Sequence, residues 1–186
     1  MAIASRQLTL AEFLALPEKQ PPREFIDGMV SQKMSPKGRH SALQAALIQL
    51  LTGSAEQRAV AWALPQLRTT FAGASVVPDI AMYRRERIPV NDQGEIADEF
   101  LEPPDITIEI ASPGQSVTAL VRRCLWYVAH GVQVALLVDP EDTSVLAIRP
   151  DEPLAAWRGS DRIDLHEILP DLDLSVEQLF ASLRPV

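Results

Sequence analysis

The stretch PPDITIEIASP, residues 103–113, decides the expected fold. Isoleucine occupies every second position from 106 to 110, and Thr107 and Glu109 stand between the isoleucines. Because successive side chains of a β-strand point to opposite faces, this period of two is typical of a strand. The sequence therefore predicts a β-strand that carries a carboxylate among apolar residues.

A predicted helix and a second predicted strand follow this stretch. The helix spans residues 116–130 and ends at Gly131, and the apolar run VALLV covers residues 134–138. A short, wholly apolar run is typical of a strand that is buried on both faces. A strand, a helix and a buried strand in this order predict a right-handed parallel crossover.

The chain before this crossover also carries clear local signals. Thr9 and Glu12 have the spacing of a capping box, which predicts a helix over residues 10–16. Asp27 and Gly28 form a turn dipeptide between two strand-like runs, which predicts a β-hairpin. Further expected elements are a helix over 40–51, strand-like stretches over 59–70 and 75–83, an exposed acidic loop over 89–104, and a last helix capped by Ser175. We expect an α/β (α+β) fold with a mixed β-sheet flanked by helices.

Length and composition place limits on the class of protein. A chain of 186 residues is expected to form a single domain, residues 1–186. The single cysteine excludes an intrachain disulfide, and we find neither a signal peptide nor an apolar run of membrane-spanning length, so a cytoplasmic protein with no membrane association is expected. A net charge of -8 is unfavourable for strong binding of nucleic acid over a broad surface, although a local basic patch is compatible with it.

Two carboxylates in predicted strands are the candidates for chemistry. Asp79 lies in VVPDIAMY, residues 76–83, and Glu109 lies in the strand described above. Burial of a carboxylate is costly unless a cation compensates its charge, and Mg²⁺ or Mn²⁺ is one such cation. Asp79 and Glu109 could hold the ion and leave positions open for water and phosphate. Pairing with arginine, or a solvated face, would explain these two acids equally well.

Longer motifs in this order resemble a known family. They are REFIDGMVSQKMSPKGRH (23–40), VVPDIAMY (76–83), PPDITIEIASP (103–113), WYVAHGVQVALLVDP (126–140) and LPDLDLSVEQLF (169–180). Together they resemble the Uma-type family of putative bacterial restriction endonucleases, formerly a domain of unknown function. The resemblance implies the restriction-endonuclease-like fold of the PD-(D/E)xK nucleases.

The resemblance also implies roles for individual residues and for partners. Asp79 becomes the first acid and Glu109 the second, with Glu24 as an additional acid near the site. The carbonyl of Ile110 is a further expected ligand of the metal. DNA is the expected substrate, and a homodimer is expected because restriction-type nucleases often act as dimers.

The chain departs from the family pattern at the expected lysine. Ala111 stands where the nuclease signature has lysine, two residues after the second acid. The family resembled places a lysine on the following helix, four residues before a tyrosine; here Tyr127 is kept and Arg123 replaces the lysine. Arginine can hold phosphate but cannot accept a proton. Lys19, Lys33 and Lys37 lie far upstream, and none is expected at the site.

Two main hypotheses follow. The first is a Mg²⁺-dependent DNA endonuclease in which Arg123 positions phosphate and Arg84, Arg85 and Arg87 supply a basic approach surface. The second is a catalytically impaired protein on a nuclease scaffold that acts as a homo-oligomeric binding or interaction module. A metal-dependent hydrolase of another phosphodiester is a third possibility.

Two other residues, His40 and Cys124, have side chains that could take part in chemistry. His40 opens the helix expected over 40–51 and could face the site, although a structural role is favoured. Cys124 has no activating partner in the sequence and is interpreted as an inert thiol that contributes to packing.

Overall fold

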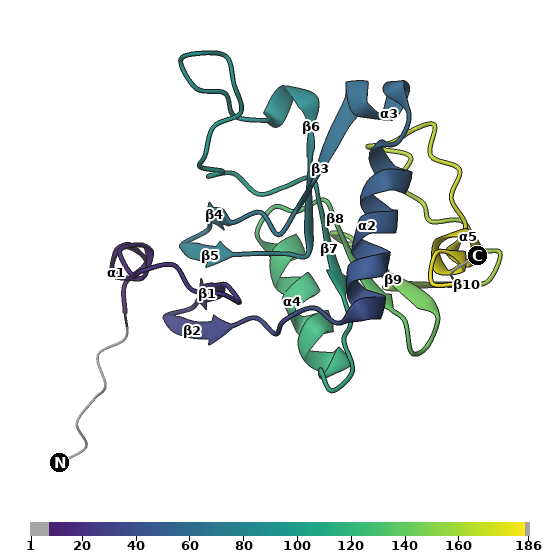
Figure 1. Cartoon of the computed structure of the whole chain (residues 1–186), viewed down its shortest axis with the longest axis horizontal. Coiled ribbons are helices and arrows are strands. Elements are labelled where there is room, and N and C mark those ends of the chain that lie inside the picture. The colour runs from purple at the N-terminus through teal and green to yellow at the C-terminus, as the bar shows by residue number, and fades with distance from the viewer. Residues whose placement is uncertain (1–7, 185–186) are drawn as a thin grey trace.

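A six-stranded mixed sheet forms the centre of the fold, with the strand order β10-β9-β8-β7-β6-β3 (Figure 1). The structure is a computed structural model that describes residues 8–184, apart from the side chains of residues 55, 56 and 58. The strands of this sheet are β3 (Ala61–Pro65), β6 (Ile80–Arg84), β7 (Ile106–Ile110), β8 (Val134–Asp139), β9 (Ser144–Ile148) and β10 (Ala155–Arg158). β7 and β8 are parallel, and every other neighbouring pair in this sheet is antiparallel.

A smaller antiparallel sheet lies beside the first, with the order β2-β1-β5-β4. Its strands are β1 (Arg23–Ile26), β2 (Met29–Gln32), β4 (Thr69–Phe71) and β5 (Ala74–Val76). The helix α1 (Leu10–Leu14) packs against this sheet, where Phe13 stacks on Phe25 of β1 with ring centroids 5.4 Å apart. The smaller sheet therefore holds the N-terminal segment against the body of the protein.

Helices cover both faces of the six-stranded sheet. The isoleucines of β7 pack with α2 (Gly38–Thr52) and α5 (Val176–Ala181) in one apolar cluster. The opposite face packs against α4 (Val117–Ala129), whose Cys124 and Tyr127 are fully buried. All five residues of β7 are consequently buried, including Thr107 and Glu109.

Most of the predicted elements are present. The β7–α4–β8 crossover is parallel as expected, the hairpin turns at Asp27 and Gly28, and Ser175 caps α5 through a capping box. The two turn residues have φ of 50° and 76°, which suits the two-residue hairpin turn. The fold class is confirmed as mixed α and β with helices on the sheets.

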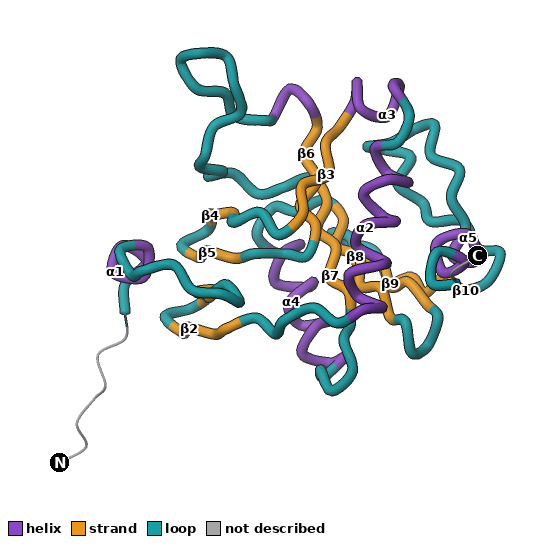
Figure 2. Tube along the Cα trace, viewed as in Figure 1, coloured by secondary structure: helices purple, strands orange, loops and turns teal. Residues whose placement is uncertain are grey.

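Three predicted stretches differ from the structure. The stretch over 75–83 contains two strands, β5 and β6, that belong to different sheets. The stretch over 59–70 begins inside the helix α3 (Ala55–Val60), which is started by a capping box between Ser54 and Gln57. The loop over 89–104, drawn in teal at the upper left of Figure 2 after the 3-10 helix η1 (Arg85–Arg87), is not exposed throughout. Phe100 is buried in it and packs on Tyr83, because the loop must return to the sheet before β7 begins.

No helix within residues 8–184 is long and apolar enough to cross a membrane. The predicted domain boundaries, 1 and 186, both lie outside the described residues.

Candidate active site

Asp79 and Glu109 come together because β6 and β7 are neighbouring antiparallel strands. The register pairs Ile80 with Ile108, so Asp79, just before β6, stands next to Glu109 in β7. Both side chains are almost wholly buried, with 3% and 2% of their surface exposed. Two carboxylates buried this closely need hydrogen-bond donors and positive charge around them.

Asp79 is held by three groups from different parts of the chain. Its Oδ2 accepts a 2.8 Å hydrogen bond from the backbone N–H of Ile110, and its Oδ1 accepts one of 2.7 Å from Nζ of Lys33. Nε2 of His40 lies 3.5 Å from the same Oδ1. Burial alone would raise the pKa of Asp79, but His40 and Lys33 outweigh burial and lower this pKa to about 2.

Glu109 faces α4 and is fixed by two of its residues. Oε1 accepts hydrogen bonds of 2.8 Å from Nε of Arg123 and 2.7 Å from the hydroxyl of Tyr127. The same Arg123 Nε also donates to the Tyr127 hydroxyl at 2.8 Å. Arg123 and Tyr127 are one helical turn apart, so α4 presents both to one carboxylate.

Glu24 joins this group from the smaller sheet. It lies in β1, is 1% exposed, and accepts a 2.7 Å hydrogen bond from the backbone N–H of Val77. Its carboxylate also pairs with the guanidinium of Arg123. The structure thus brings together the four predicted catalytic side chains, Glu24, Asp79, Glu109 and Arg123.

Lys33 also belongs to the site, and the expectation that no lysine reaches it is wrong. Nζ donates to Asp79 Oδ1, to Glu109 Oε2 at 3.3 Å and to the carbonyl of Val77 at 2.8 Å. Burial alone would lower the pKa of Lys33, but the charges of Glu109 and Asp79 raise it above its ordinary value. Lys33 is therefore a protonated cation between two carboxylates.

The hairpin register was the signal that could have identified Lys33. A turn at Asp27 and Gly28 pairs Glu24 with Ser31. Side chains two residues apart share a face of a strand, so Ser31 and Lys33 lie on the face that carries Glu24. Distance along the sequence concealed a placement that the turn already determined.

His40 faces the site, as the sequence allowed, and its structural role stays a prediction. It lies in the first turn of α2 and is buried. Its Nδ1 is 3.1 Å from the hydroxyl of Ser112, and its Nε2 points toward Asp79. The sequence motif that ends in His40 carried this signal, but a histidine at a helix start is not specific enough to assign.

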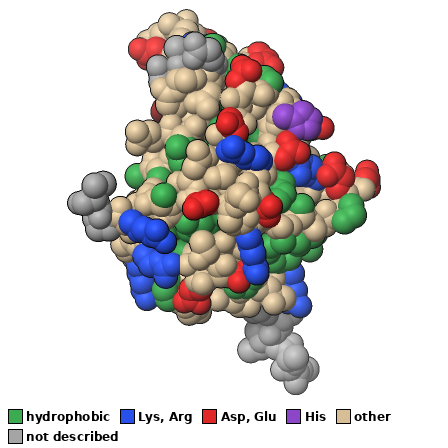
Figure 3. Space-filling model, turned by 90° about the vertical axis from the view of Figure 1, so that its right-hand side faces the viewer, with side chains coloured by type: hydrophobic (Ala, Val, Ile, Leu, Met, Phe, Trp, Pro, Cys, Tyr) green, Lys and Arg blue, Asp and Glu red, His purple; other side chains and the backbone are tan. Residues whose placement is uncertain are grey.

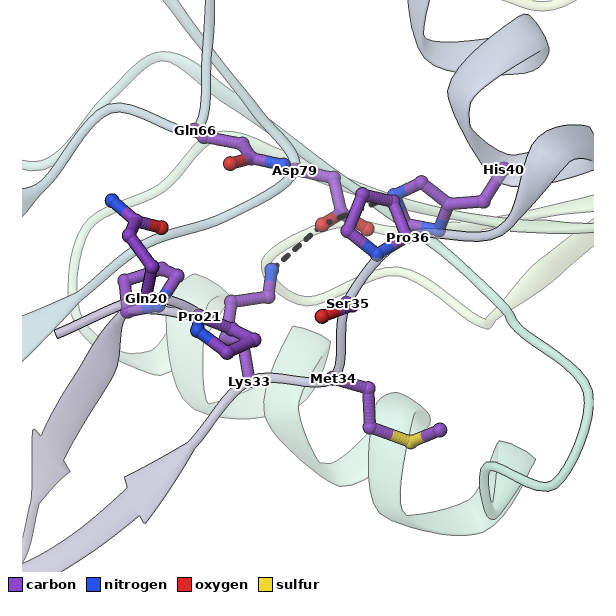
Figure 4. Close-up of a pocket in the computed structure, with 10 residues that line it drawn as sticks. Gln20, Pro21, Lys33, Met34, Ser35, Pro36, His40, Gln66 and Asp79 are labelled. Atoms are coloured by element: carbon purple, nitrogen blue, oxygen red, sulfur yellow. Dashed lines mark hydrogen bonds and ion pairs between the residues drawn. The ribbon is translucent and has the colours of Figure 1, made fainter.

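An open cavity of about 200 Å³ adjoins this cluster (Figure 4). Lys33, His40 and Asp79 form its inner wall. Gln20 and Gln66 stand on one side, and the rest of the lining is Pro21, Pro22, Met34, Ser35 and Pro36. Of the buried carboxylates, Asp79 lines this cavity, together with the ammonium-bearing side chain of Lys33.

The carboxylate oxygens of Asp79 and Glu109 suit a hard divalent cation that takes only a few of its ligands from the protein. Lys33 Nζ, a cation, already has three oxygen partners here: one from each carboxylate and the Val77 carbonyl. Within residues 8–184 no group of three or more His, Cys, Asp or Glu side chains is arranged to hold a metal ion. Two carboxylates with water and phosphate oxygens match Mg²⁺, which keeps several waters, better than Zn²⁺. The carbonyl of Ile110 as a ligand stays a prediction; its N–H holds Asp79.

The basic approach surface predicted at Arg84, Arg85 and Arg87 is not supported. Buried Asp105 binds Arg84 and Arg87, each at 2.8 Å, and Arg85 lies over the ring of Trp62. The face seen in Figure 3 carries both acidic and basic side chains, with several basic ones gathered at its lower left. These arginines stabilise the fold beside the sheet and are not a free patch for phosphates.

Cys124 is buried in α4, as expected of a packing residue. Burial, together with the negative charge of Glu109, raises the pKa of its thiol far above the ordinary value. The thiol is therefore kept neutral beside the site.

Comparison with known proteins identifies the family and the fold of the chain. A family model described as "Uma2: Putative restriction endonuclease" matches residues 10–177. A crystal structure of a putative nuclease belonging to DUF820 from Anabaena variabilis ATCC 29413 is 38% identical in sequence. That match covers 95% of this chain and 99% of the other, with a TM-score of 0.90. Among curated proteins, none matches.

Proposed function

The chain belongs to the Uma2 family of putative restriction endonucleases, and from this premise we propose that it is a Mg²⁺-dependent DNA endonuclease. Membership of the family supports a nuclease-like function. The metal, the substrate and the roles of individual residues are our proposal. A cytoplasmic location stays a prediction.

One observation carries the proposal: Asp79 and Glu109 converge on a single cation position, held here by Nζ of Lys33, and Lys33 and Asp79 line an open cavity. Both are buried, and each has a carboxylate oxygen directed at that position. A structural ion pair would need no cavity beside it, whereas a hydrolytic site needs room for a phosphate and a water. Mn²⁺ is expected to support the same chemistry.

Each residue of the site has its own role in this proposal. Asp79 and Glu109 would hold the metal, which when bound polarises the phosphodiester and makes its bound water more acidic. The Ile110 N–H fixes one oxygen of Asp79 and leaves the other directed inward. Arg123 and Tyr127 orient Glu109, and Arg123 also binds Glu24. Contact between Arg123 and phosphate remains a prediction; its present contacts favour orientation of the acids.

Calorimetric titration of Mn²⁺ and Mg²⁺ tests the metal. We expect saturable binding to the unmodified protein and its loss in the double variant Asp79→Ala, Glu109→Ala. The matched control is Asp98→Ala, Glu99→Ala, which removes two acids that are exposed on the loop before β7. Nicking of supercoiled DNA should follow the same pattern. Equal metal binding by the two double variants would contradict the proposal.

A non-catalytic interaction module is the second candidate, favoured by the engagement of Arg123. Its guanidinium is held by Glu24 and Glu109, so the position expected to carry the family lysine contributes a structural ion pair. The substitution Arg123→Lys separates the two candidates. A working site should cleave DNA faster with lysine, whereas a scaffold without activity should stay inactive in both forms.

A homodimer is part of the proposal. The described residues hold one carboxylate pair of this kind, so cutting both strands of a duplex requires two copies or two successive events. Sedimentation velocity with and without a DNA duplex measures this directly. A monomer in both states would leave only single-strand nicking or successive cuts.

A further inference from the structure

Arg123 and Lys33, the two cations of the site, are held in different ways. Arg123 extends from α4 into the protein, where Glu24, Glu109 and Tyr127 take up its donors. Lys33 follows the end of β2, and its side chain lines the cavity, which Arg123 does not line. The Arg123 side chain is slightly more exposed, at 18% against 13% for Lys33, but the cation that lines the cavity is Lys33.

Lys33 also stands where a metal ion would bind. Its ammonium touches Asp79 Oδ1 and Glu109 Oε2, the two carboxylate oxygens left over from the contacts with Ile110, Arg123 and Tyr127. A divalent ion between these carboxylates would need the same oxygens. The ammonium and the ion repel each other at such distances, so they cannot share the position.

The cavity provides the second position for this ammonium. Lys33 has a long unbranched side chain with 13% of its surface exposed, and the cavity opens directly beside it (Figure 4). A shift away from Asp79 and Glu109 therefore brings the charge into the space that a phosphate would enter. A lysine ammonium is an effective point charge for phosphate.

We propose that Lys33 serves the site in two positions, as the counter-ion of Asp79 and Glu109 without metal and as the phosphate-contacting cation in the cavity once metal is bound. This inference rests on the proposed metal-dependent function. It assigns to the β2 end the cation that the family resembled carries on the helix of Arg123. It also makes the ammonium a competitor of the metal.

Metal binding without DNA tests the first position. Calorimetry with Mn²⁺ should show binding at least about tenfold tighter for Lys33→Met than for the unmodified protein, because a competing charge has gone. Lys33→Gln should behave in the same way. Lys37→Met, which removes an exposed lysine four residues further on, is the control and should leave the affinity unchanged.

Binding of DNA without cleavage tests the second position. A fluorescein-labelled 24-base-pair duplex in Ca²⁺ should bind about tenfold more weakly to Lys33→Met, since a charge-assisted hydrogen bond to phosphate is lost. Lys37→Met again serves as the control. The two affinities are expected to change in opposite directions. Lys33→Met and Lys33→Gln should bind Mn²⁺ more tightly and DNA more weakly than the unmodified protein.

Other outcomes would contradict the inference about Lys33. If the unmodified protein binds Mn²⁺ and the Lys33 variants bind metal and DNA as it does, Lys33 is only a structural ion pair. If no variant binds Mn²⁺, the proposed function fails together with this inference. Thermal melting identifies a variant that does not fold, and Lys33→Gln, which can still donate to the Val77 carbonyl, then replaces Lys33→Met.

Discussion

At the scale of single residues, the hydroxyl of Tyr127 links the acids to the helix behind them. It donates to Glu109, accepts from Arg123 and is fully buried. Tyr127→Phe should therefore lower the free energy of unfolding by about 1–3 kcal/mol, because the buried Glu109 and the partly buried Arg123 each lose a hydrogen bond. Urea denaturation measures the change.

Tyr83→Phe is the control for this substitution. The Tyr83 hydroxyl donates to the carbonyl of Glu102, away from the carboxylates. Both variants should be less stable, but only Tyr127→Phe should reduce cleavage of DNA, since it alone releases Glu109. Equal losses of cleavage would mean that the effect comes from stability alone.

The charge of Asp79 should be visible in acid. Its pKa is about 2 in the folded protein, against an ordinary 3.8, because His40 and Lys33 outweigh the opposite effect of burial. A carboxylate whose pKa is lower in the folded protein stabilises the fold at pH values above its pKa in the unfolded chain. This stability is lost as the pH falls from about 4 toward 2. Asp79→Asn should therefore show a shallower decline over this range, by about 2 kcal/mol in total. Urea unfolding at a series of pH values measures both slopes, and parallel curves would contradict the assignment.

The sequence predicted some site residues and missed others for a physical reason. Asp79 and Glu109 stand out because a carboxylate in an apolar strand is costly, and that cost is local information. Lys33 reaches Glu109 across 76 residues, so only the pairing of strands shows the contact. The contact of Arg123 with Glu24 was hidden similarly, since Arg123 lies in the helix α4 and Glu24 in the smaller sheet.

At the scale of elements, Asp105 joins the end of β6 to the start of β7. It is fully buried and binds Arg84 and Arg87, and its second oxygen accepts from the backbone N–H of Arg84. Asp105→Asn should cost about 3 kcal/mol of unfolding free energy, because two arginines lose their counter-charge. Thermal and urea unfolding measure it.

Asp98→Asn is the matched control, since Asp98 is exposed on the same loop. It should change stability by less than about 0.5 kcal/mol. A similar effect for both variants would show that Asp105 contributes no more than a surface charge.

Elements with strong local patterns were predictable from the sequence. β7 and β8 follow from alternation and from an apolar run, and the hairpin follows from Asp27 and Gly28. The helix α3 was missed because its capping residues, Ser54 and Gln57, precede a stretch of strand-like composition. Local capping decided the structure there, and composition favoured the wrong state.

At the scale of the whole molecule, a net charge of -8 limits how DNA can bind. Arg84, Arg87 and Arg123 are occupied by acids of the chain itself. Contacts with few phosphates are therefore expected, and the logarithm of the DNA affinity should fall with the logarithm of salt concentration with a slope smaller than about 4. Fluorescence anisotropy of a labelled duplex in the presence of Ca²⁺, at KCl concentrations from about 50 to about 200 mM, measures this slope. A slope near 8, on the order of that of a broad basic groove, would contradict the expectation.

The hairpin of β1 and β2 supplies Glu24 and leads directly to Lys33, whereas Glu109 lies in β7 and Asp79 just before β6, both strands of the other sheet. The site is thus complete only in molecules in which both sheets are formed and packed against each other. Parts of a protein open without global unfolding, and hydrogen exchange reports the free energy of such opening. The backbone N–H of Lys33 donates to the carbonyl of Pro22 across this hairpin, and Ser31, two residues earlier, pairs with Glu24 in the same phase of the ladder. The protection of the backbone amides of Ser31 and Lys33 therefore sets an upper limit on the fraction of molecules that have an assembled site. A ligand that bridges the two sheets should slow exchange at these amides, far along the chain from the carboxylates that it binds.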